Sequence, residues 1–130
     1  CLGYPIWISI QKIINSAIGF RGAKRALTKY ALNARADGYL ALKEYLEKGY
    51  LKLTDKNAIR KIEYIKKIYK PNGLIGIQDK KEIRKLHAES PDYADCAMMA
   101  LYAINFCTKT IIEEVSAQSS FLESEFEPFE

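Results

Sequence analysis

Apolar residues recur at helical spacing along much of this chain, and each such stretch predicts a helix. The clearest lies at residues 24–48, where apolar positions three and four apart form one stripe and Gly49 supplies a typical stop. Two shorter helices are predicted, one from Thr54 or Asp55 to about residue 63 and one from Asp79 to about residue 87. Each of them begins at a side chain that can cap a helix.

Short apolar runs predict strands between these helices. Residues 17–20 and 50–53 are each expected to form a short strand, and residues 4–14 favour a helix although their β-branched side chains also suit a strand. A β-hairpin is predicted over residues 64–78, because apolar side chains alternate with lysines before the turn sequence Pro71-Asn72-Gly73. Strands interspersed with helices indicate an α/β fold, with a short sheet flanked by helices.

The last predicted helix carries the most informative pattern in the chain. Ser90 is expected to be its N-cap and Pro91 its first residue, so the helix should run from Asp92 to about residue 107. Residues 96–107 carry no charge and are expected to be buried, including the two cysteines Cys96 and Cys107. Asp92 and Asp95 then share one face of the first turn. Such a pair can bind a hard metal ion, but carboxylates in a first turn are also ordinary capping chemistry.

Charge is distributed unevenly along the 130 residues. All 20 basic residues precede residue 111, against 10 acidic residues there, so residues 1–110 carry a net charge of +10. Residues 111–130 hold six glutamates and no base, and we expect them to form an acidic C-terminal tail. The basic part suits a polyanionic partner, although a solvated helical surface explains it nearly as well. The residues that we expect to follow a DNA backbone are Lys66, Lys67, Lys80, Lys81, Arg84 and Lys85.

Four phrases of sequence carry a family resemblance. They are Gly19-Phe20 followed by Gly22-Ala23, then Asn33-Ala34-Arg35-Ala36, then Gly73-Leu74-Ile75-Gly76-Ile77 ahead of Lys80-Lys81-Glu82-Ile83, and finally Ser90-Pro91-Asp92-Tyr93-Ala94-Asp95-Cys96. Together they make residues 19–102 similar to the C-terminal nuclease domain of the phage terminase large subunit, the motor that packages viral DNA. Asn33 and Arg35 match one of these phrases and could belong to the site. Equally, Asn33 could satisfy a turn and Arg35 could pair with a helix neighbour.

The resemblance implies a fold, a reaction and a site. Residues 1–110 would be the later half of a ribonuclease H-like nuclease domain, which cleaves double-stranded DNA with two Mg²⁺ or Mn²⁺ ions. Asp95 matches the last of the family's three acidic metal ligands and would be catalytic, while Asp92 falls beside the site and would support it. Cys96 stands where the family usually has Ala. Portal or other packaging proteins are further partners that the resemblance implies.

The resemblance also places the other two acidic ligands ahead of residue 1, since no residue before Asp37 is acidic. The chain begins with Cys rather than Met, and we expect it to be the C-terminal part of a longer or interrupted protein. Alone it should hold no metal firmly and be inactive. The alternative is a non-catalytic basic module that binds nucleic acid or a packaging protein, as the remnant of a decayed prophage gene would.

The opening apolar run, residues 4–10, is too short to cross a bilayer. The cysteines form no CxxC pair, and unpaired thiols suit a reducing compartment. We therefore expect a cytoplasmic protein without a membrane partner, and the resemblance implies that the cytoplasm is that of the bacterial host cell.

Overall fold

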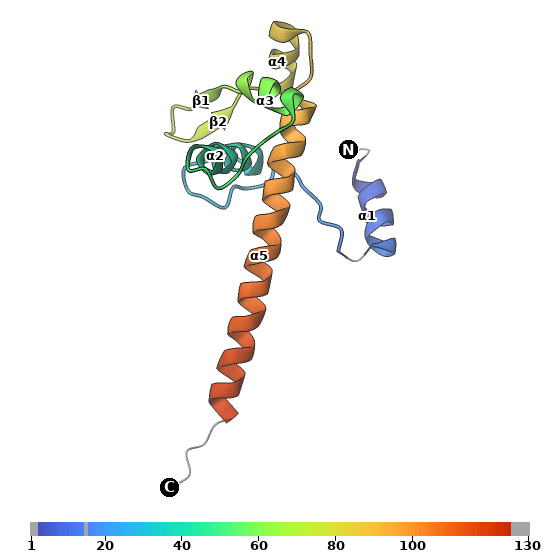
Figure 1. Cartoon of the computed structure of the whole chain (residues 1–130), viewed down its shortest axis with the longest axis vertical. Helices are drawn as coiled ribbons and strands as arrows, with labels where there is room; N and C mark the ends of the chain where they lie inside the picture. The colour runs from blue at the N-terminus through green and yellow to red at the C-terminus, as the bar shows by residue number, and fades with distance from the viewer. Residues whose placement is uncertain (1–2, 15, 126–130) are drawn as a thin grey trace.

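The computed structural model describes residues 3–14 and 16–125. The described chain combines helices with one antiparallel pair of strands, so it has an α/β composition (Figure 1). In chain order the elements are α1 (Gly3–Ile13), α2 (Ala34–Glu47), α3 (Lys56–Glu63), β1 (Lys67–Tyr69), β2 (Ile75–Ile77), α4 (Lys80–His87) and α5 (Asp92–Glu125). The end of the expected acidic tail, residues 126–130, lies outside the described residues.

The core lies where α2 and α3 pack against the first turns of α5. Its buried residues are Tyr39, Leu42, Ala94, Met98 and Leu101. Burial of a side chain such as Leu42 or Met98 is worth about 1.5–3 kcal/mol, so this small cluster is the main apolar contribution to the fold. Gly38 lets α2 approach α5 closely, because a Cβ there would lie 2.5 Å from the sulfur of Met98.

Helix α2 begins ten residues later than its apolar stripe predicts, so the prediction of one helix over residues 24–48 is wrong in its first part. The Asn33 side chain caps the helix by accepting a hydrogen bond from the Ala36 amide at 2.9 Å. The Asp37 carboxylate accepts bonds from the backbone of Leu27 at 2.9 Å and from the hydroxyl of Thr28 at 2.6 Å. These bonds hold the segment ahead of residue 33 in a turned conformation that competes with helix. The predicted stop is confirmed, since Gly49 follows the helix with φ +72°.

The hairpin and the two short helices are confirmed, whereas two predicted strands are wrong. Asp55 caps α3 and Asp79 caps α4, and β1 pairs with β2 in the register Ile68↔Gly76. Residues 17–20 and 50–53 form no strand. The outer edge of β2 is taken by residues 30–32 instead, through bonds of 2.8 Å from Leu32 N–H to Ile75 O and from Ile75 N–H to Tyr30 O. A short apolar run becomes a strand only where a free sheet edge receives it.

Helix α5 is much longer than predicted and leaves the body of the protein (Figure 1). It continues past residue 107 to Glu125, so the described part of the expected tail, residues 111–125, is helical. Because α2 and α3 cover one side of its first turns only, the expected burial of residues 96–107 is largely wrong. Cys96 and Cys107 are both exposed, and Ile104 is 59% exposed.

Helix α1 confirms the predicted N-terminal helix and lies to one side of α5, at the end of an extended connection (Figure 1). Within the described residues, we find no helix with the length and apolar character needed to cross a membrane.

Candidate functional site

Asp95 lies at the centre of the most unusual polar contacts of the fold. It is 5% exposed, in the first turn of α5, at the junction of α2, α4 and α5. The Tyr39 hydroxyl donates a 2.5 Å hydrogen bond to Asp95 Oδ1, and Arg35 Nε lies 3.6 Å from the same oxygen. The pKa of Tyr39 is raised well above its ordinary value, mainly by burial and secondly by this hydrogen bond to Asp95. The phenol therefore stays protonated and remains a donor.

The Arg35 side chain links this carboxylate to the end of the sheet. Its Nη1 donates a 3.0 Å bond to the carbonyl of Gln78, the residue after β2. Four buried polar atoms around this link have no hydrogen-bond partner among the described residues: Arg35 Nε, Arg35 Nη2, Gln78 Oε1 and Asp95 Oδ2. Arg35 Nε and Asp95 Oδ2 are instead satisfied by ion pairs, whereas Arg35 Nη2 and Gln78 Oε1 are left without a partner, which costs about 1–3 kcal/mol for each buried atom.

Lys80 joins the two carboxylates that the sequence singles out. Its ammonium forms an ion pair with Oδ2 of buried Asp95, and it lies 3.4 Å from Oδ1 of Asp92. Asp92 faces solvent, with its side chain 64% exposed. Oδ2 of Asp95 accepts no hydrogen bond from the described residues, so the ammonium of Lys80 is the group there that balances its charge. A cation therefore lies between the carboxylates of Asp92 and Asp95.

The start of α5 differs in one respect from its sequence pattern. The Asp95 amide bonds to the carbonyl of Pro91, and the Ser90 hydroxyl donates 2.8 Å to Asp92 rather than accepting from the backbone as an N-cap. The expected capping role of Ser90 is therefore wrong. The bond from Ser90, with the nearby charge of Lys80, holds the pKa of Asp92 below its ordinary value, so this carboxyl stays ionised.

Contacts from α3 and from the residue that follows it hold the turn between α4 and α5 in place. The ammonium of Lys61, whose side chain is 7% exposed, pairs with Glu89, and the His87 ring stacks on Tyr64 with centroids 3.9 Å apart. Ala88 takes a left-handed conformation with φ 54° between them. The His87 side chain is therefore half-buried in a packing contact. These contacts set the position from which α5 begins.

The arrangement has a definite metal-binding capacity. Carboxylate oxygens are the ligands that Mg²⁺ and Mn²⁺ prefer, and Asp92 and Asp95 present two of them around one cation. No group of three or more His, Cys, Asp or Glu side chains that could hold a metal is found in the described part of the chain. The donor set thus fits a divalent ion only as part of a larger site.

The residues expected to follow DNA fall on the hairpin and on α4, which are joined by residues 78 and 79. All are exposed except Lys80, which is half-buried and turned toward the carboxylates. Arg84 is also engaged, through a 3.2 Å bond to the Ser90 hydroxyl. The other four are Lys66, Lys67, Lys81 and Lys85.

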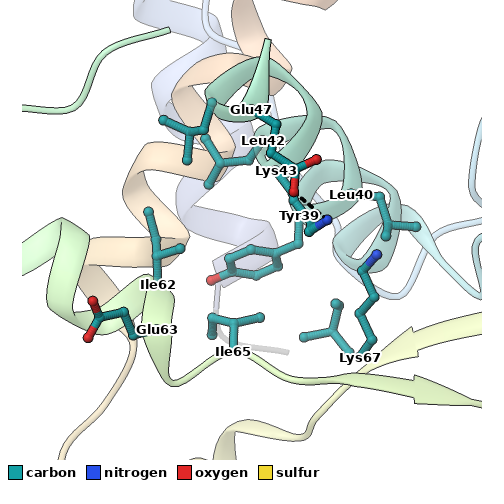
Figure 2. Close-up of a pocket in the computed structure, with 11 residues that line it drawn as sticks. Tyr39, Leu40, Leu42, Lys43, Glu47, Ile62, Glu63, Ile65 and Lys67 are labelled. Atoms are coloured by element: carbon teal, nitrogen blue, oxygen red, sulfur yellow. Dashed lines mark ion pairs between the residues drawn. The ribbon is translucent and has the colours of Figure 1, made fainter. Parts of the chain in front are cut away.

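A separate groove of about 370 Å³ lies between α2, α3 and β1 (Figure 2). Apolar side chains line most of it, and Figure 2 shows the Tyr39 ring reaching from α2 toward Ile62 and Ile65. On its rim, Lys43 pairs with Glu47 at 2.6 Å. Glu63 and Lys67 are the other charged residues that line the groove.

Sequence reasoning found Asp92, Asp95 and Lys80 but not the way they are joined. Sequence reasoning did not single out Tyr39, and only its spacing of four from Arg35 on one helix face could have suggested a shared site. Arg35 does contact a helix neighbour, since its guanidinium lies over the Tyr39 ring at 5.2 Å from the centroid, but it also bonds to Gln78 and pairs with Asp95. Asn33 serves the local structure as the α2 cap.

Comparison with known proteins identifies no relative. No protein-family model matches the chain, and no curated protein or solved structure is significantly similar to it. The site must therefore be interpreted from its own chemistry.

Proposed function

We propose that this chain is the C-terminal part of a metal-dependent endonuclease that cuts double-stranded DNA, of the terminase type and with a ribonuclease H-like fold. Asp95 supplies one acidic ligand and Asp92 supports it, while the remaining acids come from outside these 130 residues. In a site of this kind, two Mg²⁺ or Mn²⁺ ions activate water and stabilise the leaving oxygen of the scissile phosphate.

The observation that supports this proposal most is the position of Lys80. A positive charge lies between Asp92 and Asp95, where a divalent ion would be bound by the same oxygens. Oδ1 of Asp95 is fixed by Tyr39 and Arg35, so Oδ2 is held toward the cation. A carboxylate pinned through one oxygen is preorganised to bind a metal through the other.

A second function has an observation of its own in favour. Arg35 and Lys80 already neutralise Asp95, so its carboxylate is equally suited to hold α2, α4 and α5 together. Lys66, Lys67, Lys81 and Lys85 remain exposed on the hairpin and α4. Such a surface binds DNA phosphates without any catalysis, and the chain would then be a basic nucleic-acid-binding module.

A plasmid-cleavage assay decides between them. With Mn²⁺, the 130-residue chain alone should leave supercoiled plasmid intact, because it lacks most of the acids that hold two ions. The same chain extended with the coding sequence upstream in its gene should cut the plasmid, and Asp95→Asn should abolish the cutting. Glu82→Gln, which removes an exposed acid on α4, is the matched control and should cut normally.

Two results would count against the nuclease. An extended chain that binds duplex DNA but never cuts it would favour the basic module. Strong Asp95-dependent cutting by the 130 residues alone would show that the other ligands lie within this chain.

A further inference from the structure

We infer that Lys80 is a displaceable counter-ion that closes the Asp92–Asp95 pair, and that it leaves the carboxylates for a DNA phosphate when a divalent cation enters. This regulation rests on the proposed function, since it concerns the same carboxylates. It assigns Lys80 a role as a positioning residue that couples metal binding to DNA binding.

The first support is the place of Lys80 in its helix. It is the first residue of α4, directly after the cap Asp79. The positive end of a helix dipole disfavours a cation at that position. The ammonium is therefore held there by the carboxylates of α5 and not by its own helix.

The second support is the asymmetry of the contact. The Asp95 side chain is 8% exposed and fixed at Oδ1, whereas the Lys80 side chain is 40% exposed. Lys80 reaches the pair from the solvent side with a flexible stem of four methylene groups. Of the groups in contact here, the ammonium can withdraw without any rearrangement of the core.

The third support is what the carboxylates lack. Oδ2 of Asp95 is buried and accepts no hydrogen bond, so the departing ammonium leaves a vacant, negatively charged oxygen beside Asp92. A divalent cation restores the charge balance and can bind both oxygens. The site therefore exchanges one cation for another and is never left as two bare carboxylates.

DNA provides the place to which Lys80 moves. Lys81, Arg84 and Lys85 lie on the same short helix and are exposed, so a phosphate backbone drawn to α4 offers Lys80 a new anionic partner. Because coupling between two ligands is reciprocal, duplex DNA should strengthen metal binding at the Asp92–Asp95 pair, and metal should strengthen DNA binding.

The test is a Mn²⁺ titration of the 130-residue chain, followed by paramagnetic broadening of the amide resonances of residues 92–96. This readout reports metal at the pair and ignores metal bound to the DNA itself. Lys80→Gln should bind Mn²⁺ about tenfold more tightly than the wild-type chain, the effect of losing one competing ion pair. Lys56→Gln is the matched control and should behave as wild type, because Lys56 is exposed and stands first in α3 after the cap Asp55, as Lys80 stands first in α4 after Asp79.

Two more variants keep the result interpretable. Lys80→Arg retains the charge and should bind Mn²⁺ as the wild type does, which separates charge from misfolding. Adding Asp95→Asn to Lys80→Gln should remove the broadening. A short duplex should lower the Mn²⁺ concentration needed by the wild type several-fold, but that needed by Lys80→Gln less than twofold.

Because two carboxylates alone should bind Mn²⁺ only weakly, the titration is carried to high Mn²⁺ concentration. Equal Mn²⁺ affinity of the wild-type chain and Lys80→Gln, or no broadening at residues 92–96 in either even at high Mn²⁺, would overturn the inference. Its failure is distinct from that of the proposed function. Tighter Mn²⁺ binding by Lys80→Gln, without cleavage by the extended chain, would support the counter-ion role of Lys80 and contradict the proposed nuclease function. Asp95-dependent cleavage, with unchanged Mn²⁺ affinity in Lys80→Gln, would support the nuclease function and contradict the counter-ion role of Lys80.

Discussion

Replacement of Gly38 by Ala tests how closely α2 must approach α5 for the Asp95 contacts to form. A Cβ at this position would lie 2.5 Å from Met98 Sδ and 2.8 Å from Met98 Cγ. Met98 is 1% exposed, so it cannot turn into solvent to relieve the overlap. Either Met98 leaves its preferred conformation or the two helices move apart.

The magnitude follows from two opposing effects. Overpacking a filled core costs about 1–3 kcal/mol, and this overlap with a fully buried side chain belongs at the upper end. Ala in place of Gly inside a helix stabilises by about 1 kcal/mol. The net expectation for Gly38→Ala is a loss of about 2 kcal/mol in the free energy of unfolding.

Urea denaturation followed by circular dichroism measures this loss, and a double-mutant cycle assigns it. Met98→Ala alone should cost about 2–5 kcal/mol through the cavity it leaves. The double variant should cost less than the sum of the two, because the new methyl group enters the space that Met98 vacates. Met99→Ala, which alters the partly exposed neighbour, should show no such coupling to Gly38→Ala.

A Gly38→Ala chain that is about 1 kcal/mol more stable than the wild type, as helix propensity alone requires, would refute the close approach. Additive effects of Gly38→Ala and Met98→Ala would refute the assignment to Met98.

Three other predictions concern the loop, the α3 contact and the tail. Asp37→Ala should release the turn ahead of α2, cost about 1–2 kcal/mol through three lost hydrogen bonds at Leu27 and Thr28, and speed hydrogen exchange at these two amides. Lys61 holds the pKa of Glu89 below its usual 4.5, so this pair stabilises the fold above about pH 4.5 and loses its effect as the pH falls through the lowered value. Glu89→Gln should therefore lose stability at pH 7 by leaving buried Lys61 unpaired, and its acid unfolding should be less steep; equal pH profiles of the two proteins would contradict this. In a gel shift at about 0.15 M salt, deletion of residues 113–130 should change duplex DNA affinity by less than about twofold. The first glutamate removed, Glu113, lies about 30 Å along α5 from Asp92 by helical rise, well beyond the ~8 Å screening length. A large tightening would instead show that the tail folds back onto the basic residues.

Local signals in the sequence were sufficient for several elements. Asp55 and Asp79 cap their helices through bonds within three residues, and Pro71-Asn72-Gly73 closes a hairpin whose strands are adjacent in the chain. Such contacts form wherever the segment lies, so the sequence alone determined them. It also marked Asp92 and Asp95 as a pair on one helical turn, since that spacing is a property of the helix itself.

The tertiary structure decided what depends on distant partners. The apolar stripe ahead of residue 33 would continue a helix, but Asp37 and the free edge of β2 bind its backbone more effectively. Burial along α5 depends on the side that α2 and α3 cover, which is why Met98 is in the core and Cys96 is exposed. Asp95 is buried and Asp92 exposed for the same reason, and Tyr39, Arg35 and Lys80 reach Asp95 from segments 15 to 60 residues away along the chain. Neither spacing nor composition can show those contacts, because they exist only when the helices have packed.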